Sequence, residues 1–229
     1  MFHVWGNHEV YGCQRRHIIH MPEMATSKHL GQTDDVDMTN YYWHDITDKL
    51  RLVCLDLYEI SPLGYEKTDE MYIKSTEIID HYRKLYEASN DPAQKDYYLR
   101  FRVYGGAASS TQMRWLESQL LECERLGKKI LLAGHIPLLI NAGDKYVAWN
   151  ADDILKLIWS FDHVVVAYLC GHAHVGHYYL DEHGVHHLTL SAILETPPNT
   201  HNSYVTAEVY SDRLLIRNEN PVGGFTAHF

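Results

Sequence analysis

The sequence predicts a mixed α/β fold in which strand–helix alternation gives way to β hairpins toward the carboxyl terminus. Short apolar runs separated by amphipathic segments indicate the alternation. Two pairs of short runs around tight turns, near residues 181–184 and 211–212, indicate the hairpins. No internal repeat or low-complexity tract divides the 229 residues. We therefore expect one domain built on a mixed sheet or on two stacked sheets.

The amino-terminal part predicts one strand end, a surface excursion and a β pair. Residues 2–5 are apolar and lead into a glycine, which is typical of a buried strand that enters a loop. Residues 13–40 are polar and irregular, so we expect a surface segment. Residues 41–43 and 50–56 predict two antiparallel strands joined by a turn.

The middle of the chain predicts three helices. Residues 70–88 have helical spacing, and the Pro- and Asp-containing residues 89–96 indicate a turn or loop. Residues 110–127 carry apolar side chains at helical spacing, with a serine available as N-cap and a glycine at the end. Asn150 can cap a further helix over residues 151–160.

Three apolar runs end in polar loops. They read FHVWGNHE, ILLAGHIP and VVVAYLCGHAH. Because ligands of α/β sheets bind beyond the carboxyl ends of strands, we expect all three loops to face one crevice. The polar residues placed there are Asn7, His8, His135, His172 and His174.

These residue types suit a metal site. Imidazole nitrogens bind Zn, Mn or Fe, and an amide oxygen can complete the set. With an extended backbone, His172 and His174 point in different directions, so each could reach a different ion of a pair. Two ions roughly 3.5–4 Å apart clamp a phosphoryl group and activate water. Each motif alone has a structural explanation, such as a turn at Asn7. Their co-occurrence at three strand ends favours the metal site.

Composition limits the classes of partner and indicates the cell compartment that we expect for this chain. The formal charge is −10 and no basic stripe occurs, so we expect no nucleic-acid partner. The four cysteines are dispersed without a C-x-x-C pair, which indicates reduced thiols in the cytoplasm. The apolar runs are too short to span a bilayer, so we expect no membrane partner. We also expect a monomer.

The order G-N-H-E, G-H and G-H-x-H resembles the second half of the signature of calcineurin-like metallophosphoesterases. Longer segments are similar to the manganese-dependent ADP-ribose/CDP-alcohol diphosphatases, among them LVCLDLYEISPLGYE, YGGAASSTQMRWLESQL, VAWNADDILKLIWS and GHAHVGHYYLDEHGVHHLTLSAILETPP. The resemblance covers nearly the whole chain. It implies an α/β/β/α sandwich in a single domain over residues 1–229.

The resemblance also implies roles for individual residues. Asn7, His135 and His172 correspond to three ligands of one metal ion, and His174 corresponds to a ligand of the other. His8 corresponds to the histidine that contacts the phosphate and serves as general acid. The expected cofactors are two divalent ions, Mn²⁺ first, with Zn²⁺ or Fe as alternatives.

Three further residues lie in segments that resemble family segments near the site. Trp149 is a weak candidate for stacking on a base or ribose, although a place in the core is the better interpretation. Tyr58 and Glu195 are the other two. The implied substrates are ADP-ribose, CDP-choline and related nucleoside diphosphate derivatives. They are hydrolysed at a phosphoric anhydride to a nucleoside monophosphate and a phosphorylated product.

The family signature begins with D-x-H and G-D-x-x-D, and neither precedes Met1. We therefore expect the first strand–helix units of the domain to be absent, which leaves one metal with His174 alone and the other without its bridging carboxylate. Whether the chain holds one ion or two stays open. The alternatives are an incomplete sequence of an active enzyme, a catalytically impaired binding or scaffold protein, and an unstable fragment.

Overall fold

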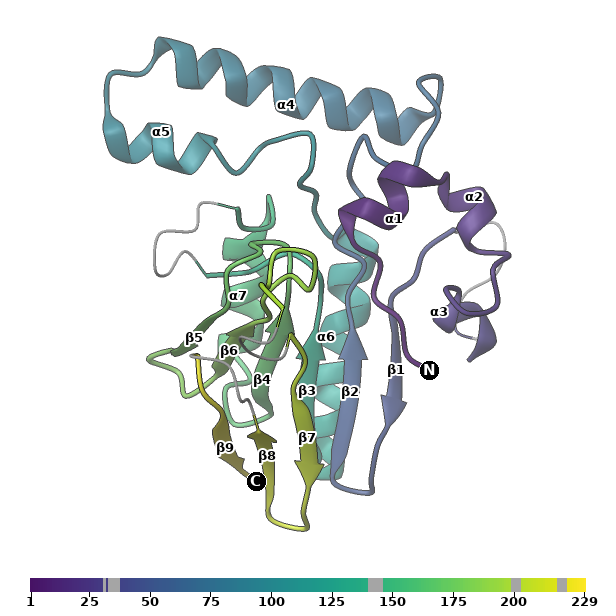
Figure 1. Cartoon of the computed structure of the whole chain (residues 1–229), viewed down its shortest axis with the longest axis vertical. Coiled ribbons are helices and arrows are strands. Elements are labelled where there is room, and N and C mark those ends of the chain that lie inside the picture. The colour runs from purple at the N-terminus through teal and green to yellow at the C-terminus, as the bar shows by residue number, and fades with distance from the viewer. Residues whose placement is uncertain (31, 33–37, 140–145, 199–202, 218–221) are drawn as a thin grey trace.

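The computed structural model describes residues 1–30, 32, 38–139, 146–198, 203–217 and 222–229. These residues form three layers, in which two helices cover one face of a six-stranded sheet and a three-stranded sheet covers the other (Figure 1). The expected mixed α/β class is therefore confirmed. Among these residues no helix has the length and apolar character of a membrane span.

The large sheet has the strand order β1-β2-β3-β4-β6-β5. Its strands are β1 (Tyr42–Asp45), β2 (Leu50–Cys54), β3 (Lys129–Ala133), β4 (Val165–Cys170), β5 (His177–Leu180) and β6 (His186–Thr189). The pairs β2–β3, β3–β4 and β4–β6 are parallel, whereas β1 and β5 run antiparallel at the two edges. Four carboxyl ends therefore meet at one edge of the sheet. Both antiparallel pairs expected from the sequence are confirmed.

Helix α6 (Ser110–Leu126) and helix α7 (Ala151–Trp159) form the helical layer. The Ser109 side chain accepts from the Gln112 N–H, and Gly127 ends α6 in the left-handed region at φ 66°. Both expected signals of α6 are confirmed. Asn150 is the N-cap residue of α7, as expected, but its side chain bonds the backbone of Ala108 instead of the N–H groups of its own helix.

The small sheet contains β7 (Thr206–Val209), β8 (Arg213–Arg217) and β9 (Phe225–His228), all antiparallel. Leu214 and Ile216 are buried against the large sheet, and each fully buried aliphatic side chain contributes about 1.5–3 kcal/mol. On β9, Phe225 and Ala227 are also buried, whereas the residues that alternate with them, Thr226 and His228, are exposed. The described residues thus form three layers of the expected four-layered sandwich.

The expected strand at residues 2–5 is wrong. The His3 N–H donates to Thr26 Oγ1, and the His3 carbonyl accepts from Asn40 and Tyr42, so side chains occupy the backbone groups that a strand would pair. Helix α1 (Asn7–Gly12) begins at once, and the Gly6 N–H donates to the Glu9 carboxylate at 2.8 Å.

The segment expected to be a surface excursion is partly buried. It contains helix α2 (Arg15–Ile18) and helix α3 (Thr26–His29). Arg15 and Ile18 are fully covered, and Arg15 forms a buried ion pair with Asp56. The polar composition of this segment predicted exposure, but its charged residue Arg15 is buried because it pairs with Asp56.

Helix α4 (Glu70–Ala88) has the expected bounds, but helix α5 (Pro92–Tyr98) replaces the expected turn. Asp91 accepts from the Ala93 N–H at 2.9 Å, and Pro92 suits the first helical position. The two helices form a hairpin beyond the carboxyl edge of the large sheet (Figure 1). The stacked rings of Tyr82 and Phe101, with centroids 3.5 Å apart, fix the following segment against α4.

Candidate metal centre

The expected crevice forms at the carboxyl edge of the large sheet. His135 follows β3, and the loop with His172 and His174 follows the neighbouring parallel strand β4. Asn7 and His8 open α1 and so arrive from a helix, not from the expected strand. The structure brings all five predicted residues to this edge.

Three donor atoms converge at the base of the crevice. His135 Nε2 lies 3.0 Å and His172 Nδ1 lies 3.4 Å from Asn7 Oδ1. Ligands about 2.0–2.2 Å from a shared ion lie about 3.0–3.5 Å from one another, so these separations fit one metal ion. Beneath them the buried Tyr58 hydroxyl lies 3.5 Å from His172 Nδ1.

The electrostatics favour a neutral imidazole at His135. Burial, reinforced by the neighbouring His172, lowers the pKa of His135 to about 3. The imidazole is therefore uncharged at neutral pH, which is the state that binds a metal. Burial also raises the pKa of Tyr58 well above its usual value, so the phenol keeps its proton.

His174 occupies the opposite side of the loop. Its Nδ1 lies 2.7 Å from Glu195 Oε1, which leaves Nε2 free for a ligand, and its ring lies 6.5 Å from that of His8. The expected extended backbone is wrong here, because His172 and His174 have φ values of 68° and 61°. Their side chains nevertheless face different partners, Asn7 and Glu195.

No group of three or more His, Cys, Asp or Glu side chains within the described ranges is arranged to hold a metal ion. The Asn7 cluster contains two histidines and an amide, so it lies outside that description. The donor chemistry still fits a divalent ion, because amide oxygen and imidazole nitrogen are both common ligands.

A cleft of about 740 Å³ opens above these residues. This volume lies within the range of about 300–1,000 Å³ typical of small-molecule sites. The lining of the cleft contains the predicted residues Asn7, His8, His172 and His174 together with Glu195. It also contains a second set, which we call the arginine wall: Arg100, Arg102, Tyr104, Gly105 and Tyr146.

Sequence reasoning missed the arginine wall. Arg102 donates from Nη1 to the Tyr146 hydroxyl at 3.1 Å and from Nε to the Leu99 carbonyl at 2.9 Å, so its guanidinium is held in place. The alternating arginines of LRFRVY are the one local signal for this wall. Trp149 is buried, with its ring 6.0 Å from that of Phe101, which is a core position.

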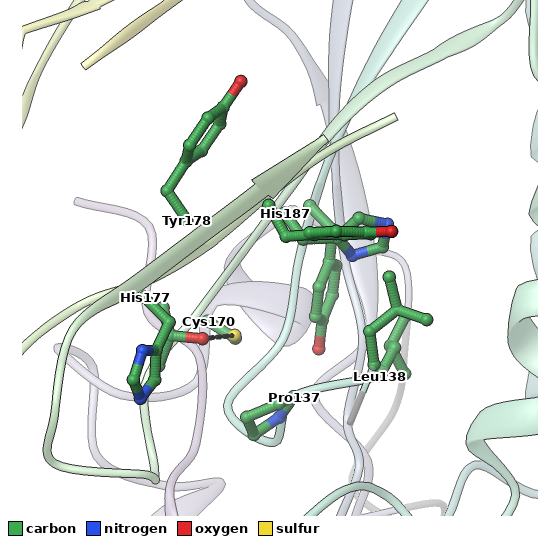
Figure 2. Close-up of a pocket in the computed structure, with 10 residues that line it drawn as sticks. Pro137, Leu138, Cys170, His177, Tyr178 and His187 are labelled. Atoms are coloured by element: carbon green, nitrogen blue, oxygen red, sulfur yellow. Dashed lines mark hydrogen bonds between the residues drawn. The ribbon is translucent and has the colours of Figure 1, made fainter. Parts of the chain in front are cut away.

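A second cavity lies behind the histidine loop, between β4, β5, β6 and the segment after β3. It is lined by Pro137, Leu138, Cys170, His177, Tyr178 and His187, among others (Figure 2). The Cys170 thiol lies 3.3 Å from Thr189 Oγ1 in this cavity. Its volume of about 30 Å³ has room for about one water molecule, so it is not a substrate site.

Curated relatives match nearly the whole chain. The manganese-dependent ADP-ribose/CDP-alcohol diphosphatase of Arabidopsis thaliana is 30% identical over 217 residues, covering 94% of this chain and 66% of that protein. The protein of the same name from Xenopus laevis is 29% identical over 239 residues, covering 99% of this chain. The chain spans 66% of the length of each of these relatives. No family model matches the chain.

A solved structure shares the fold. The crystal structure of a dimetal phosphatase from Danio rerio superposes with a TM-score of 0.86 at 28% sequence identity. The match covers 99% of this chain and 71% of that one. The similarity therefore includes the strands, the loops that follow them and the helical hairpin.

Proposed function

This chain belongs to the metallophosphoesterase superfamily, and from that membership we propose that it is a metal-dependent hydrolase of nucleoside diphosphate derivatives. ADP-ribose and CDP-choline are the proposed substrates, with a nucleoside monophosphate and a phosphorylated partner as products. The convergence of Asn7 Oδ1, His135 Nε2 and His172 Nδ1 beneath the cleft is the observation that carries the proposal. The names of the relatives support the substrate class.

We propose that Asn7, His135 and His172 hold one divalent ion and that His174 binds a second. Mn²⁺ is the proposed metal, because the relatives are named as manganese-dependent; Zn²⁺ or Fe also suits these donors. When bound, such ions activate water and stabilise the charge that develops on the phosphoryl oxygens. Glu195 fixes the ring of His174 through the 2.7 Å contact.

The proton for the leaving group is assigned to His8. This residue follows Asn7 directly, lines the cleft and is exposed to it. An imidazole in this place can donate to the phosphate oxygen that departs. On the arginine wall, Arg102 is proposed to offer its remaining N–H groups to the second phosphate. Residues 1–229 are proposed to act as one domain, with both walls of the cleft supplied by the same chain.

The test is hydrolysis of ADP-ribose and CDP-choline with and without Mn²⁺, using the chain and its His172→Ala variant. We expect Mn²⁺-dependent release of AMP or CMP, lowered at least about 100-fold by His172→Ala, since losing a ligand exceeds the effect of losing its support. His183→Ala is the matched control, because His183 lies in the β5–β6 turn and contacts Trp159. Turnover that ignores both Mn²⁺ and His172→Ala would falsify the proposal.

A further inference from the structure

Two large aromatic side chains stand exposed in the wall of the cleft. Tyr11 is 69% exposed and Tyr104 is 55% exposed, and both line the cleft together with His8 and His174. A protein surface contains scattered aromatics, but two neighbouring exposed rings in a cleft that polar groups also line indicate a binding role.

Different elements hold the two rings in position. Tyr11 lies three residues after His8 in α1, so the two side chains share one face of the helix. Tyr104 lies in the turn that the Gly105 N–H closes on the Arg102 carbonyl at 3.0 Å. The ring centroids are 6.2 Å apart with an interplanar angle of 53°.

We propose that Tyr11 and Tyr104 form a stacking subsite for the nucleobase of the substrate. The inference rests on the proposed function, since it assigns the nucleoside arm of that substrate. A planar base between two rings needs a separation of about 7 Å, which is two carbon contacts of about 3.5 Å. The rings require a rotation toward parallel and an opening of under about 1 Å, and exposed side chains turn freely.

The charge beside the pair identifies the ligand class. Arg102 stands two residues before Tyr104 and has no acidic partner among the residues that the structure describes. An aromatic face next to a fixed guanidinium matches a base next to a phosphate. An apolar ligand would leave this cation without a counter-charge.

Stacking has a consequence for specificity. Every base has a π face, so stacking accepts purines and pyrimidines alike, whereas hydrogen bonds to base edges do not. The relatives carry ADP-ribose and CDP-alcohol in one name, which combines a purine with a pyrimidine. A Tyr11–Tyr104 subsite gives a single physical reason for such breadth.

The experiment compares ligands with and without a base. AMP, CMP and ribose 5-phosphate are titrated by calorimetry into the Mn²⁺-loaded chain and its Tyr11→Ala, Tyr104→Ala, Tyr11→Phe and Tyr104→Phe variants. We expect each alanine variant to weaken AMP and CMP binding by roughly 5- to 100-fold and to leave ribose 5-phosphate unchanged. The phenylalanine variants should bind within about threefold of the parent chain, because the ring is retained.

Equal affinity of the parent chain for AMP and ribose 5-phosphate would overturn the inference, as would alanine variants that bind nucleotides normally. Diphosphate hydrolysis is measured on the same samples, so the two proposals fail separately. Base-dependent binding without hydrolysis contradicts the proposed function alone. Hydrolysis without any effect of the tyrosines contradicts the stacking subsite alone.

Discussion

Gly6→Ala should weaken Mn²⁺ binding at the proposed metal centre while leaving the fold intact. Gly6 precedes α1 and has no side chain, and this allows His135 to approach the backbone. A Cβ atom at this position would stand 2.7 Å from His135 Cε1 and 2.8 Å from Nδ1 of the same ring. It would also stand 2.8 Å from Glu9 Oε2, the end of a flexible side chain that can turn aside. The Gly6 φ of −102° suits alanine, so the effect is purely steric.

The magnitude follows from the contact distances. Ordinary van der Waals contact begins near 3.4 Å, so the His135 ring must retreat by about 0.7 Å from the new carbon. His135 is half-buried, and the rings of His172 and Tyr58, with centroids 5.3 and 6.0 Å away, limit its retreat. Its Nε2 then leaves the 3.0 Å position beside Asn7 Oδ1. Displacing a ligand in this way weakens metal binding by roughly 10- to 100-fold, which is about 1.4–2.8 kcal/mol.

The assay is Mn²⁺ titration by calorimetry together with thermal unfolding of the metal-free chain. Gly12→Ala is the matched control, because a Cβ at the other end of α1 meets nothing within 4 Å. We expect Gly12→Ala to bind Mn²⁺ like the parent and to gain about 0.5–1 kcal/mol of stability. Unchanged Mn²⁺ affinity in Gly6→Ala, or an equal loss in Gly12→Ala, would refute the steric argument.

Three further outcomes are expected. Glu195→Ala frees the ring of His174 and should weaken a second Mn²⁺ by roughly 10- to 100-fold in the same titration; an unaltered second binding step would contradict this. Asp56→Ala leaves the Arg15 guanidinium buried without its partner and should cost about 3–5 kcal/mol in urea unfolding, and a loss below about 1 kcal/mol would argue against the pair. Burial by itself raises the pKa of Asp181, but hydrogen bonds from His187 and Trp159 lower it to about 2. Because this folded value lies below the unfolded value of about 3.9, roughly 2 kcal/mol of stability is complete above pH 4 and is lost as the pH falls to about 2. Thermal melts of the parent and Asp181→Asn between pH 2 and 5 check this, and identical pH profiles would exclude the carboxylate.

The sequence predicted correctly those helices whose ends are determined by neighbouring residues in the chain. Helix α6 carries its own stop in Gly127 and its own cap in Ser109, so its bounds follow from the sequence. Helix α5 was missed because Asp91 and Pro92 are typical both of a turn and of a helix start, and the sequence does not decide between them. The strand at residues 2–5 failed for a tertiary reason, since His3 bonds to residues more than twenty positions away.

For the candidate site as well, some features could be predicted from the sequence and others required the structure. Asn7, His135, His172 and His174 stand in short motifs after apolar runs, so their shared location could be predicted. Which atoms of these side chains converge, and that Asn7 arrives on a helix, required the structure. Arg102 and Tyr104 belong to no recognised motif. They reach the cleft through the placement of the α4–α5 hairpin, which the sequence does not reveal.

The left-handed backbone of His172 and His174 lowers the folding stability of the metal-free chain at the two positions that are proposed to bind ligand. A residue with a Cβ adopts φ values of 68° and 61° at a cost of roughly 1–2 kcal/mol each, whereas glycine adopts them freely. Without metal, His172→Gly or His174→Gly should therefore fold more stably than the parent. If these histidines bind metal as proposed, the ligand restores through binding the stability that the left-handed backbone removes.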